Sequence, residues 1–125
     1  MNQRLNRIRQ ILVVLVLIAA VQGFSSCTKY EFLPRPVDPN HVWSFSVDIQ
    51  PIFTANCVTC HGGVQAPILS EGKSYSALSK GGFIKAPGEE SRLYLQMISS
   101  SHTSRSSDQD KQKVLFWINQ GALNN

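Results

Sequence analysis

Residues 56–63, NCVTCHGG, contain two of the three cysteines of this 125-residue chain. Cys57 and Cys60 are three positions apart, and His61 follows directly. In a helix, side chains three and four positions apart lie on the same side of one turn. The spacing therefore predicts a helical turn that presents two thiols and one imidazole to the same place.

This C-x-x-C-H arrangement is typical of covalent haem attachment. The two thiols can add to the two vinyl groups of the haem while the histidine binds the iron. The sequence therefore predicts one covalent haem c, held by Cys57 and Cys60 through thioethers and by His61 as the proximal iron ligand.

Three other uses of closely spaced cysteines remain as alternatives. A thioredoxin-like redox pair expects a βαβ context, and the sequence has no strand pattern of useful length. A structural zinc site needs four ligands, but no second C-x-x-C and no spaced histidine pair completes the set. A plain disulfide would leave the adjacent histidine unexplained.

The first 26 residues have the layout of a secretory signal peptide. A positive start is followed by the apolar run 11–21, ILVVLVLIAAV, and then by small residues. The run is shorter than the roughly twenty apolar residues that span a bilayer. The positive charges are Arg4, Arg7 and Arg9. We expect a cleaved signal peptide at 1–26, and an uncleaved signal-anchor helix is the alternative.

The third cysteine, Cys27, follows the small residues directly. This position resembles the lipobox of bacterial lipoproteins, in which the cysteine becomes the lipid-carrying N-terminus. Phe24 stands where such boxes prefer leucine. The resemblance implies a lipoprotein-type signal, with lipidation of Cys27 that tethers the chain to a membrane surface. An ordinary cut nearby, with Cys27 as a spare thiol, is the alternative.

Removal of residues 1–26 changes the charge balance. Nine Lys and Arg remain against eight Asp and Glu, so the mature chain is almost neutral and the pI of 9.2 partly reflects the signal. Without a basic patch, we expect no binding to nucleic acid.

The mature chain divides into a linker and one domain. Residues 27–42 hold the anchor and a proline-containing linker without helical or strand periodicity. The domain follows at 43–125. A domain of about eighty residues is marginally stable without an additional staple, and a covalent haem would supply part of its core.

Helical patterns predict an all-α domain of three to five short helices. In 46–57, Ser46 is the expected N-cap, and the apolar residues recur at helical spacing. Further helices are expected at 74–78, before two glycines, and at 87–99, where acidic residues suit the first turn. The apolar residues of the first segment are Ile49, Ile52 and Phe53.

The last helix has the clearest signals. Ser107 and Asp110 form a pattern similar to a capping box, and Gly121 is the expected stop. The expected buried stripe consists of Val114, Leu115 and Ile118, with Phe116 and Trp117 beside it.

The domain resembles the class I c-type cytochromes, in particular the small monohaem domains of bacterial lipoproteins. The resemblance covers about residues 45–125 and rests on DIQPIFTANCVTCHGG, APILSEG, GGFIKAPGEESRLYLQMI and KVLFWINQGALNN. It implies a small cytochrome c-like fold in which the first and last helices cross. The expected contacts are Ile49 and Phe53 against Trp117 and Ile118.

The resemblance also implies roles for residues around the iron. The carbonyl of Pro67 is expected to accept the N–H of His61, which would fix the ring. Such domains usually supply a methionine as the sixth ligand, but here HTSR, residues 102–105, occupies that region, with Thr103 near the methionine position. The alternatives are ligation by His102, ligation by Met97, or an open site.

The resemblance implies a function in single-electron transfer at the cell envelope, with redox proteins as partners and no enzymatic reaction of its own. A binder of CO, NO, O₂ or peroxide with an open or His-ligated sixth position is the alternative, as is a lipoprotein module in which the haem is only a staple. We expect export and a lipid anchor, in either the inner or the outer membrane.

Overall fold

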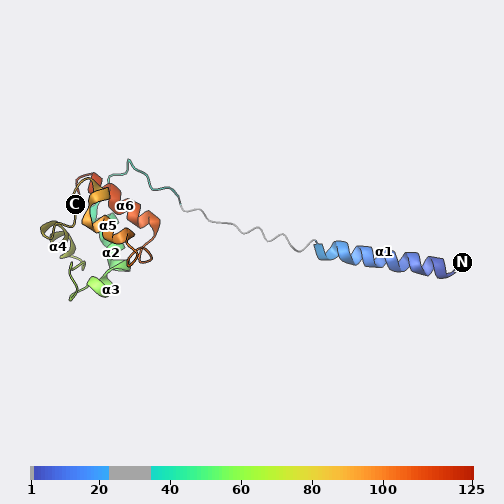
Figure 1. Ribbon diagram of the computed structural model, residues 1–125. Coiled ribbons are helices and arrows are strands. Elements are labelled where there is room, and N and C mark those ends of the chain that lie inside the picture. Colours follow the sequence, from blue (N-terminus) through green and yellow to red (C-terminus); the bar gives the residue numbers. More distant parts are fainter. Residues whose placement is uncertain (1, 23–34) are drawn as a thin grey trace. The chain divides into compact units, whose positions relative to one another are not determined.

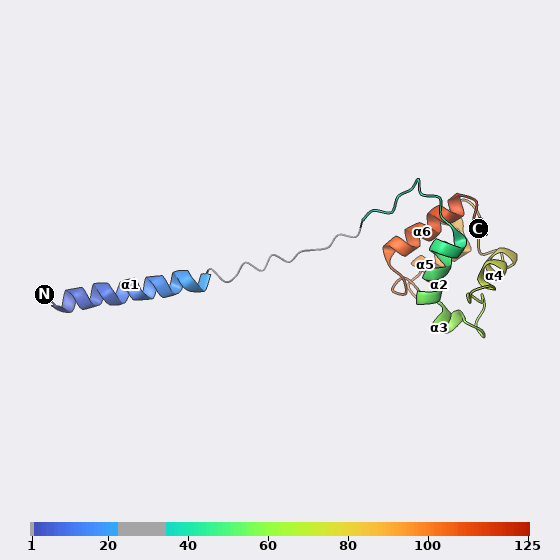
Figure 2. The ribbon, with the colours of Figure 1, turned by 180° about the vertical axis from the view of Figure 1, so that it is seen from behind.

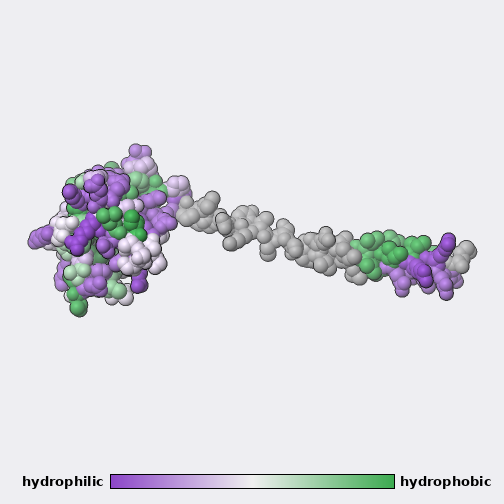
Figure 3. Space-filling model, viewed as in Figure 1, coloured by the Kyte–Doolittle hydropathy of each residue, from purple (hydrophilic) through white to green (hydrophobic). Residues whose placement is uncertain are grey.

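The computed structural model describes residues 2–22 and 35–125, and the chain divides into two compact units, Met1–Leu33 and Pro34–Asn125. In the first unit, α1 spans Asn2–Gln22 (Figure 1). Figure 3 shows hydrophilic residues near the start of α1 and hydrophobic ones farther along. None of the described helices is both long and apolar enough to cross a membrane. The expected signal peptide remains a prediction, and Cys27 lies outside the described residues.

The regular elements of the second unit are all helical and its described range, 35–125, contains no strand, which confirms the all-α class for this part of the chain. Figures 1 and 2 show α2 in the middle of the unit, α4 and α6 on opposite sides of it, and α3 at one end. The elements are the π-helical turn η1 (Phe45–Ile49), α2 (Gln50–Asn56), α3 (Val58–His61), α4 (Ser74–Lys80), the 3₁₀ turn η2 (Gly88–Glu90), α5 (Arg92–Ile98) and α6 (Asp108–Asn119).

The first helical segment begins two residues earlier than predicted. Ser44, not Ser46, is the N-cap: its hydroxyl accepts from the N–H of Val47, and its own N–H donates to the Asp48 carboxylate at 2.9 Å. The hydroxyls of Ser44 and Ser46 both donate to the carbonyl of Asn125, at 3.0 and 2.8 Å. The bond from the N–H of Ser44 to Asp48 therefore distinguishes Ser44 as the cap.

Helix α6 begins and ends as predicted. Ser107 and Asp110 form a complete capping box, and Gly121 follows the helix with φ of 102°, a conformation that glycine adopts without strain. The buried stripe differs from the prediction. Leu115 is only half-buried, whereas the buried positions include Trp117 and, unexpectedly, Lys111.

Two other helices differ from the predictions in their limits. α4 begins at Ser74 and ends at Gly81 as predicted, but it continues past residue 78 to Lys80. The acidic residues expected in the first turn of α5 form the separate turn η2, because Ser91 is extended, with φ −64° and ψ 130°. The Ser91 hydroxyl donates to the carbonyl of Phe83 at 2.7 Å, which holds the chain in this bend.

Within the second unit, one hydrophobic core connects its first helical segment, η1 and α2, to its last helix, α6. η1 packs against α6, and the ring of Phe45 lies 5.3 Å from that of Trp117 and 6.3 Å from that of Phe53, measured between centroids. The four residues expected at the helix crossing all lie in this core. Its members are Trp43, Phe45, Ile49, Ile52, Phe53, Leu69, Leu78, Leu93, Met97, Val114, Trp117 and Ile118.

A polar contact in this core fixes the loop after α3. Gln50 is buried; its amide donates to the carbonyl of Leu69 at 3.1 Å and accepts from the hydroxyl of Ser74. Because buried polar groups are costly unless paired, these bonds tie the loop to α2. The loop carries Pro67, which is part of the site described next.

Candidate functional site

The cysteines and the histidine lie on one helical turn, as their spacing predicts. Cys57 ends α2 and starts α3: its N–H donates to the carbonyl of Phe53 at 2.8 Å, and its carbonyl accepts from the N–H of His61 at 2.9 Å. Both thiols are free of a disulfide; Cys57 is half-buried and Cys60 is exposed. The turn joins the core at one end and reaches solvent at the other.

The loop after α3 holds the imidazole of His61. Its Nδ1 lies 3.1 Å from the carbonyl oxygen of Pro67 and 3.2 Å from that of Gln65. Both partners are acceptors, so Nδ1 carries the proton and Nε2 keeps its lone pair. The contact with Pro67 is the one that the family resemblance implies.

Gly62 lets the chain turn directly after the histidine. A Cβ at this position would lie 2.6 Å from the carbonyl oxygen of Val58, closer than real Cβ atoms approach. A Cβ on the neighbouring Gly63 would meet nothing within 4 Å. The first of the two glycines is therefore required by packing.

A cavity of about 520 Å³ adjoins the turn. Its lining is largely apolar and includes Phe53, Leu69, Phe83, Leu93 and Met97. The charged or titratable side chains in the lining are those of the two cysteines, His61, His102, Arg92 and Arg105, and no carboxylate is among them. The cavity is thus largely apolar, with Arg92 and Arg105 as its basic side chains.

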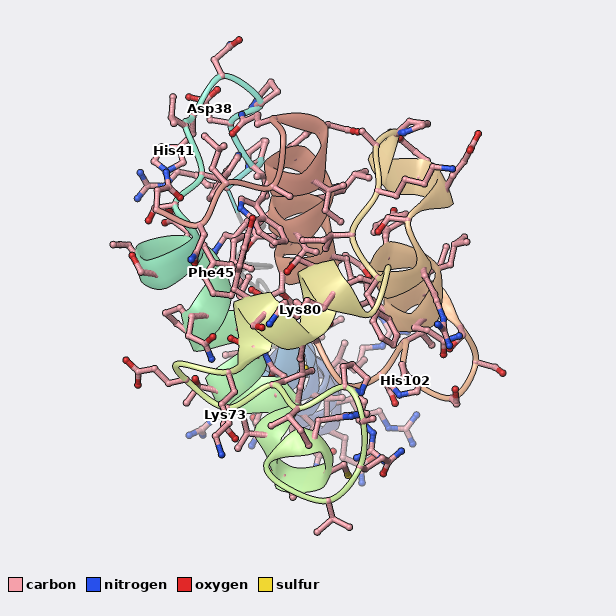
Figure 4. All side chains as sticks on the ribbon, turned by 90° about the vertical axis from the view of Figure 1, so that its left-hand side faces the viewer. Asp38, His41, Phe45, Lys73, Lys80 and His102 are labelled. Atoms are coloured by element: carbon pink, nitrogen blue, oxygen red, sulfur yellow. The ribbon has the colours of Figure 1, made fainter. Side chains whose placement is uncertain are left out.

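Two of the candidate sixth ligands also line this cavity. Met97 is buried on α5 and belongs to the hydrophobic core with Leu93. His102 lies on the loop after α5, beside the loop that follows α3 (Figure 4). The rings of His61 and His102 are 6.4 Å apart between centroids, with planes inclined by 35°.

Thr103, which the sequence resemblance puts near the expected methionine position, is exposed and does not line the cavity. Its carbonyl oxygen and hydroxyl accept from the ammonium of Lys111, at 2.7 and 3.3 Å. From this loop, His102 lines the cavity together with Ser101 and Arg105, and Thr103 does not.

Lys111 is a residue that the sequence analysis missed. Only 8% of its side chain is exposed, and its ammonium also donates to the Asp108 carboxylate at 2.9 Å. The available signal was its position three residues before Val114 and seven before Ile118, on the apolar stripe of α6. A lysine there is expected to bring its ammonium to a specific partner.

The environment of Cys57 disfavours its thiolate. Burial, chiefly, raises the pKa of the Cys57 thiol above 9.0, and the nearby charges of Asp110 and Cys60 act in the same direction. Cys57 is therefore a neutral thiol at neutral pH in the folded chain.

Comparison of the chain with protein-family models, with curated proteins and with solved structures found no match. Across residues 2–22 and 35–125, no group of three or more His, Cys, Asp or Glu side chains is arranged to hold a metal ion by itself. The features that bear on the chemistry of the site are the turn, the cavity and the two histidines.

Proposed function

We propose that this protein is a c-type cytochrome that carries single electrons at the cell envelope by means of one haem c. The observation that carries the proposal is that the C-x-x-C-H turn forms a wall of a large apolar cavity. A haem attached to this turn would have a space prepared for it on the same side as both thiols and the imidazole.

The cavity suits a haem in size and in chemistry. Its volume of about 520 Å³ falls within the roughly 300–1,000 Å³ of pockets that bind cofactors and drug-sized ligands. The apolar lining matches the porphyrin face. Arg92 and Arg105 at the margin match the two carboxylates of the haem, and the absence of Asp and Glu from the lining avoids repulsion.

In this proposal the two cysteines and the histidine of the turn each have one role. Cys57 and Cys60 hold the haem through thioethers, and His61 binds the iron through Nε2. When bound, haem supplies a one-electron couple. The carbonyl of Pro67 keeps the proton on Nδ1 and increases the donor strength of the ring.

The rest of the domain excludes water from the haem and adds apolar contacts around it. Phe53 and Leu93, both buried, contribute to this wall from α2 and α5. Low polarity around a haem is one of the means by which a protein sets the reduction potential. The protein makes and breaks no substrate bonds in this role.

The envelope location rests on the sequence alone. The signal-like residues 1–26 and Cys27 support export and a lipid anchor, and redox proteins of the envelope are the partners we propose. Mass spectrometry of the mature N-terminus tests this part independently: a diacylglyceryl group on Cys27 supports it, and an intact N-terminus, or cleavage without lipid, contradicts it.

Expression in bacteria that attach haem c tests the central proposal. The purified chain should retain haem after denaturation on a haem-stained gel and should be reduced reversibly by one electron. The Cys57→Ala/Cys60→Ala variant should lose covalent haem, whereas Ser76→Ala, an exposed change on α4, should not. A folded wild-type chain that comes out of these haem-attaching bacteria without haem would contradict the proposal.

A further inference from the structure

We infer that His102 is the second axial ligand, so that the iron is held between two imidazoles rather than between an imidazole and a thioether. This inference rests on the proposed function, because it needs a haem bound to His61. It assigns a specific role to the loop that joins α5 to α6.

The distance between the two histidine rings supports the assignment. Two imidazoles that bind one metal from opposite sides, each through a bond of about 2 Å, have ring centres about 6 Å apart. The rings of His61 and His102 are separated by 6.4 Å and both line the same cavity. Their separation along the chain is 41 positions, so the fold rather than local structure brings them together.

Each ring is also oriented through the nitrogen that would not bind iron. Nδ1 of His61 donates to the carbonyl of Pro67. Nδ1 of His102 lies 2.8 Å from the hydroxyl of Ser101 and 3.4 Å from that of Ser99. When Nδ1–H of His102 donates to the Ser101 hydroxyl, the lone pair of Nε2 is left for a metal.

The loop that carries His102 is fixed by the backbone and by α6. The N–H groups of His102 and Thr103 both donate to the carbonyl of Ser99, at 3.0 and 2.8 Å. Lys111 holds the carbonyl of Thr103 from the other side of the loop. The imidazole is thus presented by an ordered turn, which lowers the entropic cost of ligation.

Met97 has a different role in this assignment. It lines the cavity, but its side chain is 7% exposed and belongs to the core cluster. As an apolar wall residue it should be replaceable by leucine without a change of iron ligand. That replacement therefore discriminates between the two candidates.

Spectroscopy of the purified holoprotein tests the assignment. The wild type should be low-spin in both oxidation states and should not bind CO on mixing. His102→Ala should give a high-spin component and bind CO, and His102→Met should raise the reduction potential, since thioether ligation favours ferrous iron. His41→Ala, outside the cavity, should leave spectrum, CO response and potential unchanged. Met97→Leu, which keeps the cavity wall apolar, should remain low-spin and should not bind CO on mixing.

The outcomes separate the two proposals. If the wild type lacks covalent haem, the proposed function fails. If haem is attached but the wild type is high-spin or binds CO on mixing, the assignment of His102 fails while the cytochrome stands. The assignment also fails if His102→Ala and His102→Met match the wild type, or if Met97→Leu alone opens the site. Haem content measured after denaturation keeps a folding defect from being mistaken for loss of a ligand.

Discussion

Lys111 of α6 binds back to Thr103, with its ammonium 2.7 Å from the threonine carbonyl oxygen. This contact joins a buried position on the last helix to the loop that carries His102. A cation in an apolar stripe is stable because it is paired with oxygens of the loop and of Asp108.

Replacement of Lys111 by methionine should loosen this loop. We expect a loss of about 1–3 kcal/mol in the free energy of unfolding, since a hydrogen-bonded buried charge is removed while its partner carbonyl remains. Chemical denaturation measures the loss. Lys113→Met is the control, because Lys113 lies on the same helix and its side chain makes no hydrogen bond to the described residues. Equal stabilities of the two variants would show that the contact between Lys111 and Thr103 is not stabilising.

The two glycines after His61 should differ in their tolerance of a side chain. Gly62→Ala should destabilise the domain by about 1–3 kcal/mol, because its Cβ would lie 2.6 Å from a backbone oxygen. Gly63→Ala should change stability by less than about 1 kcal/mol, since its Cβ meets nothing within 4 Å. Thermal denaturation of both variants measures these losses of stability. A larger loss for Gly63→Ala than for Gly62→Ala would contradict the close packing at Gly62.

The capping box of α6 should contribute measurably to stability. Ser107→Ala removes the hydroxyl that accepts from the N–H of Asp110 at 3.1 Å, and we expect a cost of about 1 kcal/mol. Ser106→Ala is the matched control, because this side chain makes no hydrogen bond to the described residues. Urea denaturation of the pair should place only the Ser107 variant below the wild type.

The thiol of Cys57 should titrate at unusually high pH in the chain isolated without haem. Its folded pKa lies above the ordinary 9.0, so between these two values the folded state keeps a proton that the unfolded state loses. The associated stabilisation is fully present below about pH 9 and is lost as pH rises through the folded pKa.

Alkylation followed by mass spectrometry of each cysteine peptide measures this titration. The alkylation rate of Cys57 should reach its midpoint above pH 9.0 in the folded chain and near 9.0 in guanidinium. A folded midpoint at or below that of the unfolded chain would show that burial does not disfavour the Cys57 thiolate.

Local signals predicted part of this domain well. The turn from Cys57 to His61, the capping box at Ser107 and the stop at Gly121 depend on neighbours only three or four positions apart, and the structure has each of them. The predicted start of the first helical segment was wrong: Ser44 is the cap, and its hydroxyl and that of Ser46 both donate to the carbonyl of Asn125, a partner 79 or more positions away.

In the candidate site, too, local patterns predicted some features and tertiary structure decided others. From the sequence, Met97, His102 and an open position were the alternatives for the sixth position of the expected haem iron. Thr103 stood nearest the methionine position that the resemblance implies. The structure brings His102 within 6.4 Å of His61, between ring centroids, and turns Thr103 toward Lys111. No local pattern contains that information, since the loop is polar and without periodicity.

The sequence by itself determined the all-α class, the limits of its best-capped helix and the proximity of two thiols and an imidazole, because each follows from helical periodicity and from side chains that bond to nearby backbone. Tertiary structure decided which residues line the cavity and which histidine faces His61. Those outcomes depend on contacts between distant segments, whose energies arise only when the core of α2, α5 and α6 has assembled.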